Sequence, residues 1–362
     1  MDKLNHTHGG NIRESAKKYG IADKDILDFS ASINPLGMSE KARRVVITQL
    51  DSVLHYPEQF ADTLASKISE FHGIPRECII AGNGSTELIY LVPRVFRPKR
   101  ALVVIPTFSE YKNSLELVGC KTDTFLLAET DGFRVEAGRL AEALNTRYDI
   151  LYICNPGNPT GALIPKNTVL KIVDIASEDG TLCIVDEAFI DFVEEESVKK
   201  EAVARPNMIV LRSMTKFFGI PGMRIGFAIG NENNIKKMMI YKEPWSVNAL
   251  GSIAAVESLD DAEYIEESMK YMARERDGLF SALARIPWLR PFPPAANYIL
   301  ARIEREGLNA GILSDIMAKE GILIRSCTSF EGLGESFFRI AVRSRVENEK
   351  LVNALKLVLV DI

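Results

Sequence analysis

The middle of the chain alternates short runs of apolar residues with segments of helical spacing. The apolar runs are ALVVIP (101–106), ILYICNP (150–156), TLCIVDEAF (181–189), NMIVLRS (207–213) and IGFAIG (225–230), and such runs are typical of strands buried on both faces. Within residues 165–178, apolar residues recur at i, i+3, i+4 and i+7, and Pro165 suits a first helical turn. This alternation predicts an α/β fold with a mostly parallel sheet between helices.

After about residue 259 the pattern changes to long charged helical segments. The segment 261–286 is followed by NYILARI (297–303), a further helix, GILIRS (321–326) and FFRIAVRS (337–344). This order predicts a smaller α+β domain, and a chain of 362 residues is long enough for two domains. The predicted division is an amino-terminal arm that joins the small domain (1–45), a large domain (46–258) and a small carboxy-terminal domain (259–362).

Composition and charge narrow the class of partner. Apolar residues make up 46% and charged residues 26% of the chain, with a net charge of -5 and no basic cluster, so we expect no binding to nucleic acid or a membrane surface. No run of about 18 apolar residues predicts a membrane span, and the first residues lack the apolar segment of a signal peptide. The five cysteines form no CxxC pair, which indicates buried thiols, no metal site and a cytoplasmic protein.

Polar residues follow several of the predicted strands. Asn158 comes after ILYICNP, Asp186 ends TLCIVD, and Lys216 comes after NMIVLRS. Taken singly, each is explained by a turn or a helix cap. Because ligands of open α/β sheets bind at the carboxyl ends of the strands, the set together predicts a small-molecule site.

The spacing of these motifs resembles a known enzyme class. NPGNPTG, DEAF and SMTK, with Arg224 eight residues beyond the lysine, resemble the fold-type I pyridoxal phosphate (PLP) enzymes, the aspartate aminotransferase superfamily, over nearly the whole chain. The resemblance implies a large domain with a mostly parallel seven-stranded sheet, a smaller α+β domain, and PLP bound to Lys216 as a Schiff base. A nucleophilic amine must be substantially unprotonated, which burial and the nearby charge of Arg224 favour.

The resemblance also assigns residues to the cofactor ring. Asp186 would pair with the pyridine nitrogen and keep it protonated, so that the ring accepts electrons. Asn158 would donate to the ring's 3-oxygen, and Phe108 would stack on the ring. Many relatives have a tyrosine three residues after the aspartate. This chain has Phe189 there, which lacks the hydroxyl and leaves open the protonation of the Schiff base.

The cofactor phosphate requires backbone N–H groups at a helix start, hydroxyls and a guanidinium group. By the resemblance these come from Gly84, Ser85, Thr86, Ser213, Thr215 and Arg224. Tyr56 matches a tyrosine that reaches the cofactor phosphate of the neighbouring subunit, which implies a homodimer with shared active sites. Without the resemblance, GNGSTE reads more simply as a glycine turn that caps a helix.

The predictions of the substrate and of the residues that bind it depend on a narrower resemblance. HGGNIRE, DFSASINPLG, DEAFIDF, PWSVNA, ANYIL and LIRSC resemble the threonine-phosphate decarboxylases of cobalamin biosynthesis, with the histidinol-phosphate aminotransferases as close relatives. The implied reaction converts L-threonine O-3-phosphate to (R)-1-amino-2-propanol O-2-phosphate and carbon dioxide. Arg339 would bind the α-carboxylate as a bidentate fork. Arg343 lies four residues later on the same strand face, and a solvated charge is its alternative interpretation. The residues expected to bind the substrate phosphate are His8, Gly9, Gly10, Asn11, Asn34 and Arg325.

Other functions stay open at this point. Decarboxylation requires the bond from Cα to the carboxylate to stand perpendicular to the ring, whereas a perpendicular Cα–H bond gives an aminotransferase, and the sequence does not fix that torsion. GNGST after a strand suggests a Rossmann dehydrogenase, but its third glycine and its acidic partner are absent. A non-enzymatic regulator of this fold would have lost Lys216 or Asp186, and both are present.

Overall fold

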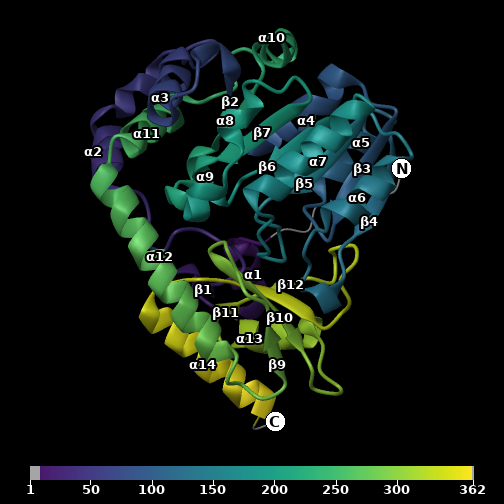
Figure 1. Ribbon diagram of the computed structural model, residues 1–362. Coiled ribbons are helices and arrows are strands. Elements are labelled where there is room, and N and C mark those ends of the chain that lie inside the picture. Colours follow the sequence, from purple (N-terminus) through teal and green to yellow (C-terminus); the bar gives the residue numbers. More distant parts are fainter. Residues whose placement is uncertain (1–8, 361–362) are drawn as a thin grey trace.

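The computed structural model of the protein describes residues 9–360. Its largest sheet has seven strands in the order β2-β8-β7-β6-β5-β3-β4, with helices on both faces (Figure 1). Only β8 runs antiparallel to its neighbours β2 and β7, so the sheet is mostly parallel as predicted. The strands are β2 Ile79–Asn83, β3 Arg100–Ile105, β4 Lys121–Leu126, β5 Ile150–Cys154, β6 Leu182–Asp186, β7 Met208–Ser213 and β8 Ile225–Gly230.

The helices of this part of the chain connect the strands and cover the sheet. They are α2 Glu40–Thr48, α3 Asp62–His72, α4 Gly84–Phe96, α5 Glu110–Glu116, α6 Ala137–Leu144, α7 Lys166–Glu178, α8 Lys199–Ala202, α9 Met214–Phe217, α10 Glu232–Tyr241 and α11 Ala249–Leu259. Short 3₁₀ helices lie at η1 Asp23–Asp25, η2 Leu50–Leu54, η3 Arg76–Cys78, η4 Glu129–Asp131, η5 Ile190–Glu196 and η6 Pro221–Met223. The predicted helix at 165–178 begins one residue later, directly after Pro165.

A second, antiparallel sheet is built mainly from the carboxy-terminal part. Its order is β12-β13-β10-β9, and the amino-terminal strand β1 pairs in parallel with β11 beside it. The strands are β1 Leu27–Asp28, β9 Leu289–Pro291, β10 Tyr298–Ile303, β11 Ile322–Leu323, β12 Arg325–Ser326 and β13 Phe337–Ala341, and the helices are α1 Ile12–Tyr19, α12 Ala262–Leu283, α13 Ala310–Lys319 and α14 Arg345–Val360. The early chain therefore pairs with the late chain through β1 and β11.

The long helix α12 runs along one side of the molecule from the large sheet to the small one (Figure 1). Asp261 caps it by accepting a hydrogen bond from the backbone N–H of Tyr264. The domain boundaries predicted after residues 45 and 258 both fall inside helices, α2 and α11, and the division stays a prediction.

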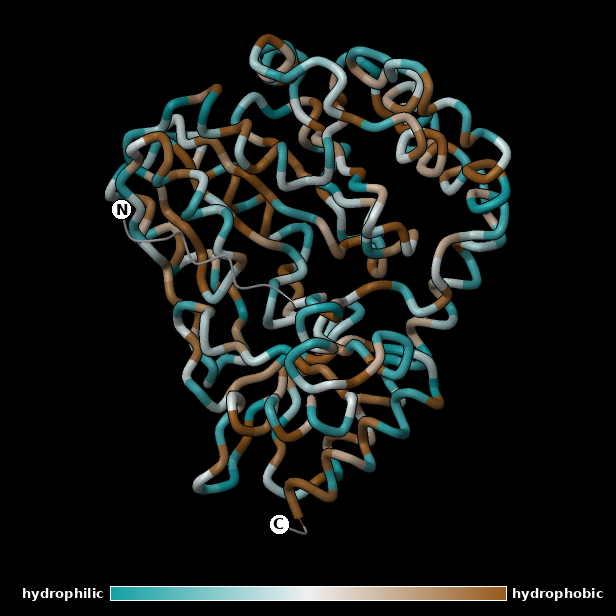
Figure 2. The backbone as a smooth tube through the Cα atoms, turned by 180° about the vertical axis from the view of Figure 1, so that it is seen from behind, coloured by the Kyte–Doolittle hydropathy of each residue, from teal (hydrophilic) through white to brown (hydrophobic). Residues whose placement is uncertain are grey.

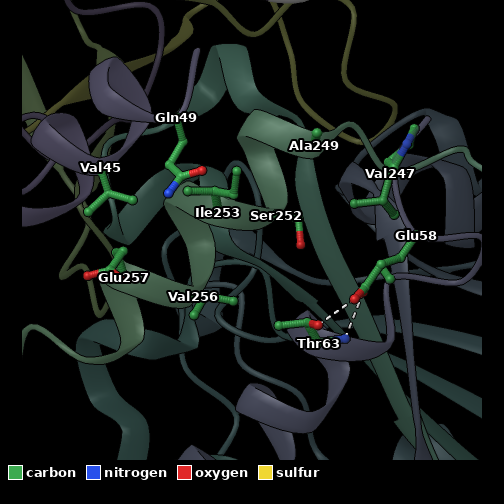
Figure 3. A pocket seen from close by; sticks show the side chains of 12 residues that line it. Val45, Gln49, Glu58, Thr63, Val247, Ala249, Ser252, Ile253, Val256 and Glu257 are labelled. Atoms are coloured by element: carbon green, nitrogen blue, oxygen red, sulfur yellow. Dashed lines mark hydrogen bonds between the residues drawn. The ribbon is translucent and has the colours of Figure 1, made fainter. Parts of the chain in front are cut away.

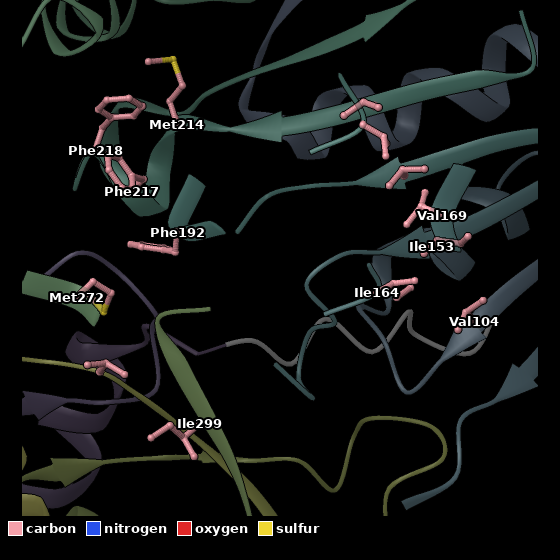
Figure 4. Close-up of a cluster of buried hydrophobic side chains, with 14 of the residues drawn as sticks. Val104, Ile153, Ile164, Val169, Phe192, Met214, Phe217, Phe218, Met272 and Ile299 are labelled. Atoms are coloured by element: carbon pink, nitrogen blue, oxygen red, sulfur yellow. The ribbon is translucent and has the colours of Figure 1, made fainter. Parts of the chain in front are cut away.

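Two apolar layers hold the large sheet, one on each face. Every residue of β5, β6, β7 and β8 is buried, which is the pattern of parallel strands covered on both sides. The apolar segments gather in the strands inside the molecule (Figure 2). One layer continues to Phe192, Phe217 and Met272, next to the helix that carries Lys216 (Figure 4), and therefore supports that helix from behind.

All five cysteines have free thiols and are buried. Between residues 9 and 360 no helix combines the length and the apolar character that crossing a bilayer requires.

Candidate active site

A cavity of about 640 Å³ lies where the carboxyl ends of the large sheet's strands face the small sheet. Asp186, at the end of β6, and Lys216, on α9, line it from the large sheet, as does Asn158 from the loop after β5. Arg325 on β12 and Arg339 on β13 line it from the small sheet. The large sheet and the small sheet thus both contribute residues to one site.

The amine of Lys216 is held in a defined place. Its Nζ donates to Thr215 Oγ1 at 2.7 Å, and that hydroxyl lies 2.7 Å from Ser213 Oγ. Nζ also lies 5.6 Å from the centroid of the Phe189 ring. Burial, aided by the charges of Arg224 and Arg339 and opposed by Asp186, lowers the pKa of Lys216 to about 8. A larger fraction of this amine is therefore nucleophilic at neutral pH than is usual for lysine.

Asp186 forms the floor of the cavity, with 3% of its surface exposed. Its Oδ2 accepts from the hydroxyl of Tyr111 at 2.7 Å, and its Oδ1 accepts from the backbone N–H of Ala188 at 3.0 Å. Burial raises the pKa of Asp186, although the hydroxyl, the N–H and the charge of Lys216 all act in the opposite direction. A cation bound in the cavity would stabilise this carboxylate further.

An ion pair on the opposite face of the sheet clamps the same strand ends. Glu187 follows Asp186, and Arg212 precedes Ser213; both side chains are at most 1% exposed, with Arg212 Nη1 3.3 Å from Glu187 Oε2. Arg212 Nη2 also donates to Asp191 and Glu194 at 2.7 Å each. Since alternate residues of a strand face opposite sides, this network fixes β6 and β7 where they present Asp186 and Ser213 to the cavity.

A phosphate-sized cradle lies at the start of α4. Gly84 is its first residue, Ser85 and Thr86 line the cavity, and Arg224 lies against the same turn. A Cβ on Gly84 would come within 2.5 Å of Arg224 Nη2, and Gly84 has a φ of +76°, so only glycine allows the guanidinium group to approach. Backbone N–H groups at a helix start and an arginine together form an anion site.

Two buried arginines face each other at the small-sheet end of the cavity. Arg325 and Arg339 are direct partners in the β12–β13 pairing and are 9% and 8% exposed. Like charges placed directly opposite on neighbouring strands repel. Arg339 donates to Asn158 and to the carbonyl of Ser30, while its buried Nε has no partner in the described chain. This end of the cavity is therefore suited to an anion.

Arg343 lies outside the strand that was predicted to carry it. β13 ends at Ala341, and the guanidinium group of Arg343 pairs with Glu347 at 2.6 Å and donates to the carbonyl of Asp28 at 3.1 Å. The prediction that Arg339 and Arg343 share a strand face is thus wrong, because the strand is shorter than its apolar pattern indicates. Arg343 still lines the cavity, but its charge is already compensated.

The amino-terminal segment closes one side of the cavity. Gly9 and Gly10 line it, and Gly10 N–H donates to Ser30 Oγ at 2.9 Å. A Cβ on Gly9 would lie 2.2 Å from the carbonyl oxygen of Ser30, so a glycine is required there. Asn11 is exposed, and neither Asn11 nor Asn34 is among the residues that line the cavity. His8 lies outside the described residues.

Comparisons with known proteins place this geometry in a family. The sequence model described as aminotransferase class I and II matches residues 24–356. The chain belongs to the class I and II aminotransferase family. It is 38% identical to the threonine-phosphate decarboxylase of Salmonella typhimurium, over 100% of this chain and 99% of that protein.

Two further relatives within the family are informative. The chain is 34% identical to the adenosylcobalamin biosynthesis bifunctional protein of Leptospira interrogans, over 96% of this chain and 40% of that longer protein. Its fold matches the crystal structure of the histidinol-phosphate aminotransferase from Clostridium acetobutylicum with a TM-score of 0.86 and 31% identity, covering 93% of this chain and 100% of that one. The fold is thus the fold-type I architecture expected from the sequence.

The cavity of this family member fits PLP on three structural grounds. A buried carboxylate at its floor, Asp186, suits a ring N–H. The cradle beside Gly84 suits a phosphate group. Lys216 lines the same cavity and its amine has a lowered pKa, as attack on an aldehyde requires.

Other sequence-predicted residues take different positions. Phe108 lines the cavity. Ser213 and Thr215 are not among the lining residues, and their hydroxyl oxygens are hydrogen-bonded to each other. Tyr56 is 87% exposed and does not line the cavity of its own chain. Phe189 packs edge-on against Tyr298, whose hydroxyl donates to Gly157 O at 2.7 Å.

Sequence reasoning missed several residues that line the cavity, among them the hydroxyl-bearing Tyr111 and Ser32. Tyr111, the partner of Asp186, lies three residues beyond Phe108, and its backbone N–H donates to Phe108 O, so its place in the turn after Phe108 was the available signal. Ser32 is 4% exposed, lines the cavity, and has a buried hydroxyl with no partner in the described chain. Asp28, Ser30 and Ser32 all line the cavity, so the period of two in DFSAS could have identified them.

Proposed function

We propose that the protein is a PLP-dependent decarboxylase that converts L-threonine O-3-phosphate to (R)-1-amino-2-propanol O-2-phosphate and carbon dioxide in cobalamin biosynthesis. The observation that carries the proposal is the full-length identity of 38% with a threonine-phosphate decarboxylase. The opposed arginines at one end of the cavity support it, because this substrate carries a carboxylate and a phosphate. The buried thiols support the proposal that the enzyme works in the cytoplasm.

When bound, PLP supplies an electron acceptor for the bond broken at the substrate's α-carbon. Lys216 is proposed as its covalent attachment point and as the group that returns a proton to the α-carbon. Asp186 would hold the ring nitrogen protonated, and Phe108 would stack on the ring. Asn158 accepts from Arg339 through its carbonyl oxygen, which leaves its NH₂ group to donate to the 3-oxygen. The proposed phosphate contacts are Gly84, Ser85, Thr86, Ser213, Thr215 and Arg224.

The substrate would lie between the ring and the small sheet. Arg339 is proposed to bind the carboxylate, since its Nε is unpartnered and Arg343 is already paired with Glu347. Arg325, Gly9, Gly10 and Ser32 are proposed to hold the substrate phosphate. Gripping both anionic ends would fix the torsion about Cα and so select the bond that is broken.

Amino-group transfer is the second candidate function. The structural match to a histidinol-phosphate aminotransferase, at 31% identity, favours it specifically. The two activities need the same lysine and aspartate, so their geometry alone does not separate them.

Incubation of the purified enzyme with PLP and L-threonine O-3-phosphate is expected to release carbon dioxide and to need no 2-oxoglutarate. The reason is that decarboxylation regenerates the cofactor in each turnover, whereas an aminotransferase requires a second substrate to remove the amino group. Gas release and the phosphorylated product would be measured with and without 2-oxoglutarate. Consumption of histidinol phosphate only when 2-oxoglutarate is present, without gas release, would establish the aminotransferase instead.

We also infer a homodimer with shared active sites. Ile47, Leu50 and Leu54, on α2 and η2, are 65%, 56% and 75% exposed, and exposed apolar clusters mark contact surfaces. A recess of about 390 Å³ lies nearby, with Val45, Ile253 and Val256 around it (Figure 3). A second copy of the chain on this surface would cover these side chains and bring Tyr56 to the neighbouring cofactor phosphate.

Combining two inactive variants in one dimer is expected to restore activity if the sites are shared. A dimer of one Lys216→Ala chain and one Tyr56→Ala chain would contain one intact site and one doubly defective site, so about half of the wild-type activity should return. Co-expression with two different tags would isolate this heterodimer. Activity no higher than the mean of the two variant homodimers would show that Tyr56 serves its own subunit.

A further inference from the structure

The segment 28–37 is a part of the predicted amino-terminal region 1–45, and from here on "the arm" means residues 28–37 alone. It links the small sheet to the turn that carries Lys216. At its start, Phe29 N–H donates to Leu323 O and Phe29 O accepts from Ala341 N–H, both at 2.8 Å. Ser30 O accepts from Arg339 Nη2 at 3.0 Å. The beginning of the arm is therefore fixed to β11 and to β13, the strand that carries Arg339.

The end of the arm is fixed to the lysine turn through Asn34. Its backbone N–H donates to Lys216 O at 3.0 Å, and its side-chain Nδ2 donates to Phe217 O at 2.8 Å. Asn34 thus holds two consecutive carbonyl groups of the turn. Its Oδ1 accepts from Leu36 N–H at 3.1 Å, and the side chain is buried with 3% exposure.

Helix α12 supports this contact from the other side. Asn34 Nδ2 lies 2.9 Å from Ser268 Oγ and 3.1 Å from the Tyr264 hydroxyl, which donates to Gly37 O at 2.6 Å. An added Cβ on Gly219 would lie 2.4 Å from the backbone of Gly37. Arm, lysine turn and helix are thus packed as one unit.

These contacts leave Asn34 without capacity for a ligand. Its two N–H groups face three acceptors, its oxygen accepts from the backbone, and it does not line the cavity. The phosphate contact expected of Asn34 from the sequence therefore has no geometric support. Ser32, two residues earlier, faces the cavity in its place.

We propose that Asn34 is a positioning residue that sets the distance between the amine of Lys216 and the substrate site on Arg325 and Arg339. This inference rests on the proposed function, since it assumes that Lys216 moves the proton. The four residue steps from Ser30 to Asn34 span at most about 14 Å, so the arm is a short link between the guanidinium group of Arg339 and the backbone of Lys216. Misplacement of a reacting group by about 1 Å can cost 10²-fold in rate.

The position of the amine decides where a proton is delivered. After the carboxylate leaves as carbon dioxide and its bond pair enters the cofactor, a proton from Lys216 Nζ to the α-carbon gives the amine product. If the proton were instead delivered to the carbon of the former cofactor aldehyde, water would release a phosphorylated aldehyde from the substrate and the amino group would stay on the cofactor. A loosened lysine turn should raise the share of this second outcome.

The test compares Asn34→Ala and Tyr264→Phe with two matched controls elsewhere. Ser258→Ala removes a buried hydroxyl that donates to Ala254 O of its own helix. Tyr148→Phe removes the hydroxyl of a buried tyrosine, which donates to Asp123. Each holoenzyme is given L-threonine O-3-phosphate, and the aminated cofactor is counted per carbon dioxide released. We expect this ratio to rise about 10-fold in Asn34→Ala, less in Tyr264→Phe and not at all in the controls.

A second readout is the pH midpoint at which the visible absorption of the holoenzyme changes. The charged groups that face the amine are Asp186, Arg224 and Arg339, and none of them is altered. Loosening the turn admits water, which stabilises the protonated form of the Lys216 nitrogen. The pH midpoint of the absorption change should therefore move upward in Asn34→Ala and stay in place in the controls. If Asn34 had a purely structural role, its replacement would lower the unfolding temperature. It would change neither the pH midpoint nor the ratio of aminated cofactor to carbon dioxide.

The outcomes separate this inference from the proposed function. A wild-type ratio and midpoint in both Asn34→Ala and Tyr264→Phe would overturn the positioning role while the decarboxylase stands. If Asn34→Ala does not fold, Tyr264→Phe decides alone, because it removes one hydroxyl from the same unit. A wild-type protein without visible absorption in the presence of PLP would overturn both.

Discussion

Replacement of Lys216 by alanine should lower the turnover number by about 10⁴-fold or more, because one side chain both attaches the cofactor and moves the proton. Treatment with PLP and borohydride should give a stable mass increase at residue 216 in the wild-type protein and none in the variant. Carbon dioxide release and mass spectrometry of the digested protein measure the two effects. Lys216→Arg should fail equally, since a guanidinium group keeps the charge but is not a nucleophile.

Lys199 is an internal control for this experiment. Burial lowers its pKa to about 8 as well, but it lies on the other face of the sheet and pairs with Glu194. With a pKa of about 8, roughly a tenth of the Lys216 amine is unprotonated at pH 7, and the attachment rate should rise with pH up to about 8 and then level off. An adduct at residue 199, or an active Lys216→Ala variant, would contradict the assignment.

Replacement of Asp186 by asparagine should reduce the turnover number by about 10²- to 10³-fold while PLP remains attached to Lys216. The change preserves the shape of the side chain but removes the negative charge that would keep the ring nitrogen protonated. Turnover and the visible spectrum should therefore change together. The measurement is the rate of carbon dioxide release at saturating substrate, with the spectrum recorded on the same sample.

Asp123→Asn is the matched control for this variant. Asp123, on β4, also accepts from a tyrosine hydroxyl, that of Tyr148 at 3.2 Å, but it pairs with Arg100 of β3 and does not line the cavity. Its replacement should leave turnover unchanged. Retention of more than about a tenth of wild-type turnover in Asp186→Asn would exclude the electrostatic role, because loss of a preorganised charge normally costs more.

The strands and the location of the cavity could be predicted from the sequence because both follow from local pattern. β8 is found at the predicted residues, and β6 ends at Asp186, where a buried apolar run meets a carboxylate. The reason is that strands buried on both faces consist of continuous apolar residues. The carboxyl ends of such strands meet at one edge, so their polar residues come together.

The arm could not be predicted in the same way. Asn34 and Ser32 are two residues apart in a segment of similar composition, yet one is fixed to α12 and the other faces the cavity. The acceptors of the Asn34 side-chain NH₂ group lie 183 to 234 residues away in the sequence, so local spacing carries no information about them. The prediction that Arg343 shares a strand face with Arg339 was wrong for a related reason. The strand ends at Ala341, whereas the apolar pattern continues through Val342.

The opposed pair of Arg325 and Arg339 has a consequence for selectivity. An amino acid with a single negative group would bring only one counter-charge to two cations that lie directly opposite each other and are 9% and 8% exposed. We therefore expect free threonine to bind more weakly than its phosphate ester, although it is small enough to enter, because the ester brings two anionic groups to this end of the cavity. Discrimination of this kind acts against lighter molecules, which a narrow pocket cannot exclude by size.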